Sequence, residues 1–133
     1  MKDHFDIRME SGALGNVSVL GLAHIGDAVY ELLVRTWLCE TGKTTSAGLH
    51  RATVARVRAQ AQAKAAEKLL PGLTEAELAV YRRGRNAKVH SVPKNAGLSE
   101  YHAATGLEAL FGWLYLKGGK RRINELFSRI MEE

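Results

Sequence analysis

The chain has little cysteine, little proline and no long apolar run. Cys39 is the single cysteine among 133 residues, so neither an internal disulfide nor a cysteine zinc cluster can form. Pro71 and Pro93 are the only prolines, and their scarcity beside abundant alanine and leucine favours helices. No apolar run approaches the roughly 20 residues that cross a bilayer, and the N-terminus lacks the apolar core of a signal peptide. These absences predict a soluble cytoplasmic protein that does not associate with a membrane.

Strand-like alternation, internal repeats and low-complexity linkers are also missing. Apolar residues recur instead at helical spacing, and we expect helices over residues 18–40, 44–70, 75–87, 99–117 and 120–132, the second with an interruption near Gly48. Residues 88–98 contain Pro93 and Gly97 and read as a loop, and residues 1–17 read as a loosely held arm. The length suits one domain. The prediction is an all-α fold, a single compact helical domain spanning residues 1–133.

The spacing also predicts which side of each helix faces the core. The expected inward positions are Leu22, Ile25, Val29, Leu32, Leu33 and Thr36; then Leu49, Val54, Val57, Ala61, Ala65 and Leu69; then Leu107, Leu110, Phe111 and Leu114; and finally Ile123, Leu126, Phe127 and Ile130.

Positive charge is unevenly distributed along the chain. The net charge is +5. Residues 43–68 hold six bases against the single acid Glu67, and residues 81–94 hold five bases and no acid. A basic pole of this kind attracts polyanions, although a solvated basic surface explains the overall charge equally well.

The segment 81–95 is the best candidate for nucleic-acid binding. Arginine forks suit phosphates, lysine adds point charge, and asparagine reaches sugar hydroxyls or base edges. A solvated helix end is the alternative, but it does not explain the total lack of acids. The expected substrate contacts are Arg82, Arg83, Arg85, Asn86, Lys88, Lys94 and Asn95.

Two carboxylates stand among apolar and small residues in expected helices. Asp27 follows Gly26, and Glu108 lies between Gly106 and Gly112. Glycines inside helices suggest closely approaching backbones, which could bring the two acids to one ion. Magnesium takes oxygen ligands and keeps several waters, so two carboxylates suffice, and an ion there could promote attack on a phosphodiester. The alternative is an Asp27–arginine pair and a Glu108 that caps or hydrogen-bonds locally.

Neighbouring polar residues leave their roles open. His24 and Glu31 share the helical stripe of Asp27. His24 could be a metal ligand, an orienting group or a satisfied residue at the edge of the core, and Glu31 is equally ambiguous. No histidine has zinc spacing with another ligand.

Taken together, these residues resemble the ribonuclease III catalytic domain. The stretch Ile-Gly-Asp-Ala-Val-Tyr-Glu-Leu at residues 25–32 is similar to that family's core motif, and Leu-Glu-Ala-Leu-Phe-Gly at residues 107–112 is similar to its second acidic helix. The short bacterial branch called Mini-III is the most similar, because it also has Arg-Arg-Gly-Arg-Asn-Ala-Lys and Val-Pro-Lys-Asn, here residues 82–88 and 92–95.

The resemblance implies a homodimer that cleaves double-stranded RNA with magnesium, without a separate double-stranded-RNA-binding domain. It implies maturation of large-subunit ribosomal RNA precursor, aided by a ribosomal protein, with Asp27 and Glu108 as metal and catalytic carboxylates. Longer enzymes carry a glutamate where this chain has Ala23 and an aspartate where it has Thr105. These departures leave open how many metals bind. They also motivate an alternative, a non-catalytic RNA-binding or ribosome-assembly module. A helical metallohydrolase for small phosphoesters is a third reading, but it needs histidine–aspartate ligands that we do not find.

Overall fold

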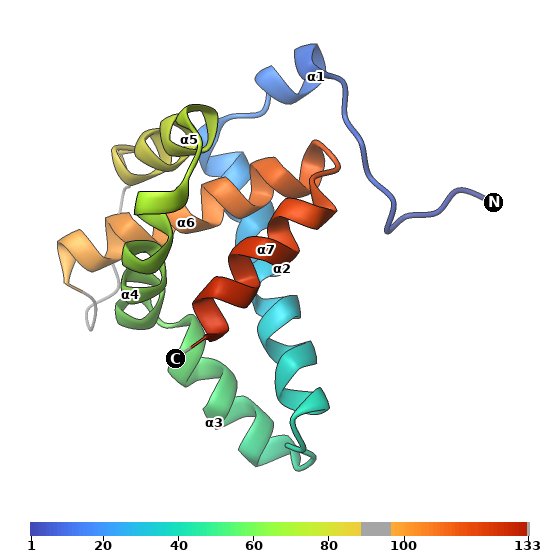
Figure 1. Ribbon diagram of the computed structural model, residues 1–133, viewed down its shortest axis with the longest axis vertical. Coiled ribbons are helices and arrows are strands. Elements are labelled where there is room, and N and C mark those ends of the chain that lie inside the picture. Colours follow the sequence, from blue (N-terminus) through green and yellow to red (C-terminus); the bar gives the residue numbers. More distant parts are fainter. Residues whose placement is uncertain (89–96, 133) are drawn as a thin grey trace.

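The computed structural model describes residues 1–88 and 97–132, and in these ranges it contains helices and no strand (Figure 1). The all-α fold is therefore confirmed. No helix in the described ranges combines the length and apolar character needed to cross a bilayer. The elements are α1 (Ser11–Gly15), α2 (Val19–Glu40), α3 (Ser46–Val57), α4 (Ala59–Leu69), the 3-10 turn η1 (Leu70–Gly72), α5 (Glu75–Arg85), α6 (Leu98–Leu116) and α7 (Lys120–Met131).

Helix α6 lies at the centre of the molecule and packs against α2, α4, α5 and α7. It crosses α2, whose second half runs beside α3 at the lower end of the view in Figure 1. The predicted inward residues of α6 are all confirmed, since Leu107, Leu110, Phe111 and Leu114 are at most 2% exposed. This buried helix is the frame on which the site described below is built.

The crossing of α2 and α6 depends on two glycines that bring the backbones together. A Cβ on Gly26 would overlap the carbonyl oxygen of Glu108, and a Cβ on Gly112 would overlap that of Leu22. The close approach expected from these glycines is confirmed. Gly106 does not take part in this crossing, because it faces Tyr81 and Gly84 on α5.

The expected helix over residues 44–70 is two helices, and the interruption is not near Gly48. The chain breaks at Arg58, whose backbone is extended with φ −65° and ψ 157°. Gly48 lies in the first turn of α3, where its N–H donates to the Thr45 hydroxyl at 3.1 Å. A glycine in a capped first turn interrupts nothing, because the cap satisfies its N–H group.

The N-terminal arm is held more firmly than expected. The N–H group of Met9 donates to the carbonyl of Leu116 at 2.7 Å. Leu14, on the short helix α1, is only 8% exposed and belongs to a small apolar cluster with Leu22 and Ala109. The prediction of a loose arm was wrong for residues 9–15, because one buried leucine fastens them to α2 and α6.

Three predicted inward residues point outward instead. Leu32 on α2 is 54% exposed, Val54 on α3 is 46% exposed, and Thr36 on α2 is exposed as well. On α2 the buried side runs through Ala23, Gly26, Tyr30, Val34 and Leu38. The sequence therefore predicted a helix correctly but chose the wrong side of it as the buried one. The buried side of α2 carries the small residues Ala23 and Gly26, which allow α6 to approach closely.

Candidate active site

Asp27 on α2 and Glu108 on α6 lie together beside the glycine crossing. The negative charge of Asp27 lies close enough to Glu108 to disfavour ionisation of the Glu108 carboxyl group. Burial and, to a smaller extent, the charge of Asp27 together raise the pKa of Glu108 to about 8. No salt bridge in the described part of the chain involves either acid. An Asp27–arginine pair, the alternative from sequence, is therefore absent from those residues.

Gln62 on α4 contacts this pair, and sequence analysis did not single it out. Its side chain is buried at 2% exposure. The Nε2 group donates to Glu108 Oε2 at 3.2 Å and to the carbonyl of Val57 at 2.7 Å. Its Oε1 atom is buried without a partner among the described residues. The break at Arg58 explains the contact, because it frees the Val57 carbonyl and turns α4 toward α6.

The signal for Gln62 was present in the sequence but weak. Gln62 is a polar residue three positions before Ala65 on the apolar side of an alanine-rich helix. A lone amide in that position is as often a surface residue as a buried one. The break in the chain at Arg58 determines that Gln62 is buried rather than exposed.

The basic end of α5 lies next to the helical turn of α6 that precedes Glu108. Gly84 packs against Thr105 and Gly106, so the arginines on either side of Gly84 emerge beside that turn. Arg82, Arg83, Arg85, Asn86 and Lys88 are all exposed. The remaining two predicted contacts, Lys94 and Asn95, lie outside the described residues.

The exposed basic residues of α5 have different surroundings. Arg83 lines a cleft of about 580 Å³ together with Arg8 and Lys117 at the N-terminal segment. Arg85 is held locally, since its Nε donates to Asn86 Oδ1 at 3.4 Å and its guanidinium lies 5.9 Å from the Tyr81 ring. Positive charge therefore continues from Arg83 on α5 to Arg8 and Lys117, two residues that the sequence analysis had not connected with α5.

The structure clarifies the surroundings of the two ambiguous residues. His24 is exposed on α2, and its side chain forms no hydrogen bond with any described residue. Glu31 is half-buried and pairs with Arg35 one turn further along the same helix. Glu31 therefore has a cationic partner of its own.

Comparison with known proteins decides the family. The family model for the ribonuclease III domain matches residues 20–119 of this chain. The chain belongs to the ribonuclease III family. Both acids and the α2–α6 crossing fall inside the matched range.

Its relatives extend the likeness over most of the chain. The chain is 50% identical to the Mini-ribonuclease 3 of Symbiobacterium thermophilum over 107 residues, which are 80% of this chain and 82% of the relative. It is 39% identical to that of a Thermoanaerobacter species over 98% of this chain and 94% of the relative. A solved structure from Fusobacterium nucleatum is similar with a TM-score of 0.82 and 28% identity, over 89% of this chain and 96% of the other. This ribonuclease III domain is an endoribonuclease.

Ala23 and Thr105 stand at the two positions where the resemblance to longer ribonuclease III enzymes led us to expect acids in those enzymes. Ala23 is buried at 7% exposure and carries no ligand atom. The Thr105 hydroxyl group donates its hydrogen to the carbonyl oxygen of Tyr101, one turn earlier on α6, at 3.0 Å. In the described ranges no group of three or more histidine, cysteine, aspartate or glutamate side chains comes together.

The remaining donors nevertheless fit the metal dependence of the family. Asp27 is exposed and Glu108 is half-buried. Two neighbouring carboxylates of this kind repel one another, and a divalent cation between them offsets that repulsion. The unpartnered Oε1 of Gln62 adds a neutral oxygen near the same acids. Such an all-oxygen set suits a hard cation that retains several waters.

Proposed function

We propose that this chain is a magnesium-dependent endoribonuclease that cleaves double-stranded RNA. The single observation that carries the proposal is the interacting pair of Asp27 and Glu108 at the α2–α6 crossing. We propose Asp27 and Glu108 as both the metal ligands and the catalytic carboxylates. Family membership supports the reaction, and the exposed bases of α5 support a polyanionic substrate.

The chain's own residues would hold the ion and the substrate. Asp27 and Glu108 would hold magnesium, and Gln62 would keep the Glu108 carboxylate aimed at Asp27. Bound magnesium would supply Lewis-acid stabilisation of the charge that develops on the phosphodiester. Arg82, Arg83, Arg85, Asn86 and Lys88, with Lys94 and Asn95 beyond the described residues, would contact phosphates and sugars.

The form of the substrate follows from the contacts available. Duplex RNA offers phosphates and 2′-hydroxyls across a shallow minor groove, and it is recognised mainly by shape. We propose the precursor of large-subunit ribosomal RNA as the biological substrate, with a ribosomal protein as a helper. We further propose a cytoplasmic homodimer in which each subunit cuts one strand.

A cleavage assay with two variants tests this proposal. Purified protein is incubated with a long RNA duplex and magnesium, with a chelator in a parallel reaction. Asp27→Asn and Glu108→Gln should each abolish cleavage, while binding to the duplex in a gel-shift assay stays close to that of the unchanged protein. Glu67→Gln, which neutralises an exposed acid on α4, is the matched control and should cut normally.

Each alternative has a distinct outcome in this assay. Duplex binding without cleavage would favour the non-catalytic RNA-binding module. Cleavage at an unchanged rate in either variant would remove that residue from the catalytic pair. Cleavage that persists undiminished in chelator would contradict the dependence on metal.

A further inference from the structure

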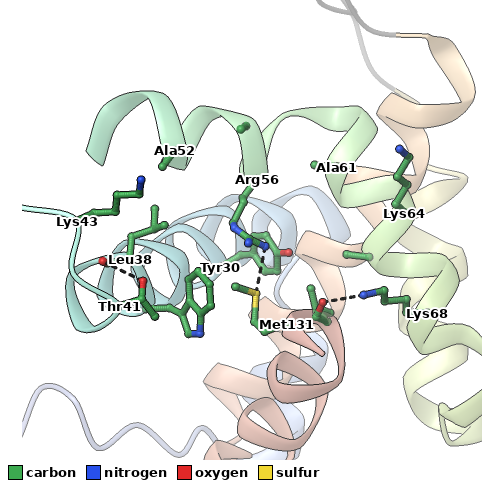
Figure 2. Close-up of a pocket in the computed structure, with 14 residues that line it drawn as sticks. Tyr30, Leu38, Thr41, Lys43, Ala52, Arg56, Ala61, Lys64, Lys68 and Met131 are labelled. Carbon is green, nitrogen blue, oxygen red and sulfur yellow. Dashed lines mark hydrogen bonds between the residues drawn. The ribbon is translucent and has the colours of Figure 1, made fainter. Parts of the chain in front are cut away.

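A second pocket lies away from the proposed catalytic pair. It has a volume of about 650 Å³ and opens between the end of α2, α3, α4 and α7 (Figure 2). None of the residues that line it is Asp27, Gln62 or Glu108. Its volume is typical of sites that take small organic ligands.

Arg56 stands in the middle of this pocket and has no anionic partner among the described residues. Its Nη1 group reaches only the sulfur of Met131, at 3.7 Å, and its guanidinium lies 4.7 Å from the centre of the Trp37 ring. No described carboxylate forms a salt bridge with it. Arg122, by contrast, is paired with Glu77 and Glu125. The sulfur is a weak acceptor, so the arginine fork retains donors for an incoming group.

Tyr30 presents a second donor beside Arg56, as Figure 2 shows. The residue is only 2% exposed, and its ring is fixed by edge-to-face contacts with Phe111 and Phe127. Its hydroxyl group has no hydrogen-bond partner in the described part of the chain. Burial raises the pKa of Tyr30 to about 12, so the hydroxyl keeps its proton at neutral pH.

The charge around the pocket indicates the class of ligand. Figure 2 shows Lys43 on one side of Arg56, with Lys64 and Lys68 on the other. Among the residues that the structure describes, no acidic side chain lines the pocket. The ammonium group of Lys68 already donates to the carbonyls of Ile130 and Glu132, at 3.1 and 2.7 Å, but it keeps its positive charge.

The walls between these charged groups are apolar and small. Ala52, Ala55, Ala61 and Ala65 leave the space that larger side chains would fill, and Leu38 and Ile130 add apolar surface. An inorganic anion alone would leave the apolar walls exposed to water. A ligand with a single carboxylate would offset only one of the four positive charges at the pocket. A phosphate dianion attached to an apolar or aromatic body satisfies both the cations and the walls.

We propose that this pocket binds a small phosphate monoester of about nucleotide size. The phosphate lies against the Arg56 fork and the Tyr30 hydroxyl, with the neighbouring lysines offsetting its remaining charge. The body of the ligand lies on the alanine-rich wall. The site is independent of the catalytic pair, and its test does not require cleavage.

Binding is measured by titration calorimetry without metal, using adenosine 5′-monophosphate, phenyl phosphate and inorganic phosphate as probes. We expect at least one of the two esters to bind more than tenfold more tightly than inorganic phosphate. Tyr30→Phe keeps the ring contacts and removes only the hydroxyl group, so the melting temperature of the free protein should not change while ester binding weakens. Arg56→Met should weaken binding about tenfold or more, the range expected for hydrogen bonds to a charged group.

Two further variants keep the proposal testable if Arg56→Met fails to fold. Ala61→Leu fills the wall without changing any charge and should abolish ester binding. Arg121→Met removes an exposed arginine outside the pocket and should leave binding unchanged. Failure of both esters to bind more tightly than inorganic phosphate would overturn the proposal. Unchanged ester affinity in both Tyr30→Phe and Ala61→Leu would overturn the proposal as well. A loss of ester affinity in Arg121→Met as large as the loss in Arg56→Met would also overturn it.

Discussion

Glu108 illustrates how surroundings rather than residue type determine what a side chain can do. Its carboxyl is partly buried, shares space with Asp27 and accepts a hydrogen bond from Gln62. Burial and the nearby negative charge both favour the protonated acid, whereas the Gln62 bond favours the carboxylate. The sequence identified both acids from their apolar and glycine neighbours. It could not identify Gln62, because that contact depends on a backbone break 50 residues before Glu108 along the chain.

Replacing Gln62 tests its positioning role. Gln62→Leu keeps the volume but removes the bond that aims the Glu108 carboxylate, so we expect the cleavage rate kcat to fall tenfold or more, as loss of a hydrogen bond to a charged group implies. The KM for duplex RNA should change little. Asn124→Leu, at an exposed amide on α7, is the matched control. An unchanged kcat, or a loss that appears only in KM, would contradict this role.

Magnesium should stabilise the folded protein through the same residues. A ligand that binds only the native state raises the melting temperature, so adding magnesium should raise that of the unchanged protein. The shift should be much smaller in Asp27→Asn, because one of the two ligands loses its charge. Removing the metal with a chelator should reverse the shift, and an equal shift in both proteins would place the ion elsewhere.

Among the elements, α5 and α7 are joined by an ion pair between the buried Glu77 and the half-buried Arg122. Arg122 donates to both oxygens of Glu77, at 2.7 and 2.9 Å, and also to the carbonyl of Gly72 at 2.9 Å. Glu77 also completes the cap of α5 by accepting the N–H of Thr74 at 2.9 Å. The hydrogen bonds from Arg122 hold the pKa of Glu77 below its ordinary value. This pair joins two helices that are 45 residues apart in the chain.

The pH dependence of stability tests that pair. Because the native pKa of Glu77 is lowered, its contribution is fully present above the ordinary pKa of 4.5 and is lost as pH falls through the native value. Glu77→Gln should therefore cost about 2 kcal/mol of unfolding free energy at pH 7. The difference from the unchanged protein should shrink in acid, as measured by urea unfolding. A difference that stayed constant with pH would contradict the ion pair.

The helix boundaries show where sequence patterns suffice and where they fail. The capping box at Thr74 and Glu77 and the glycine after α6 predicted helix ends correctly, because these signals are local. The break at Arg58 carries no such signal, since the residues around it favour helix. It is stabilised by packing, including the bond from Gln62 to Val57. The phase error on α2 has the same origin, because small residues pack closely without adding hydrophobicity.

The glycine crossing predicts a sharp difference between two alanine substitutions. Gly26→Ala would force the new Cβ into the backbone of Glu108, so α2 and α6 must separate. We expect a loss of about 3 kcal/mol or more, the upper range for overpacking. Gly12→Ala on α1 meets nothing within 4 Å and should be neutral or slightly stabilising. Similar stability of the two variants in thermal melts would contradict the crossing.

For the whole molecule, the net charge of +5 governs how it meets a polyanion. Binding to duplex RNA should weaken steeply with salt, because each neutralised phosphate releases counterions. Replacing Arg82, Arg83 and Arg85 with glutamine should reduce the slope of log affinity against log salt by about 3 if each contacts a phosphate. The measurement is a salt titration of duplex binding by the Asp27→Asn protein, so that cleavage does not interfere. An unchanged slope would place the RNA elsewhere on the surface.

Glu108, which we propose as the catalytic carboxylate of α6, also carries the backbone carbonyl that packs against Gly26. Enzymes that display their reactive groups on loops commonly lose turnover on warming before they melt, because the loops loosen first. Here the proposed reactive side chain and a backbone contact of the α2–α6 crossing belong to the same residue, Glu108. Thermal inactivation should therefore coincide with global melting.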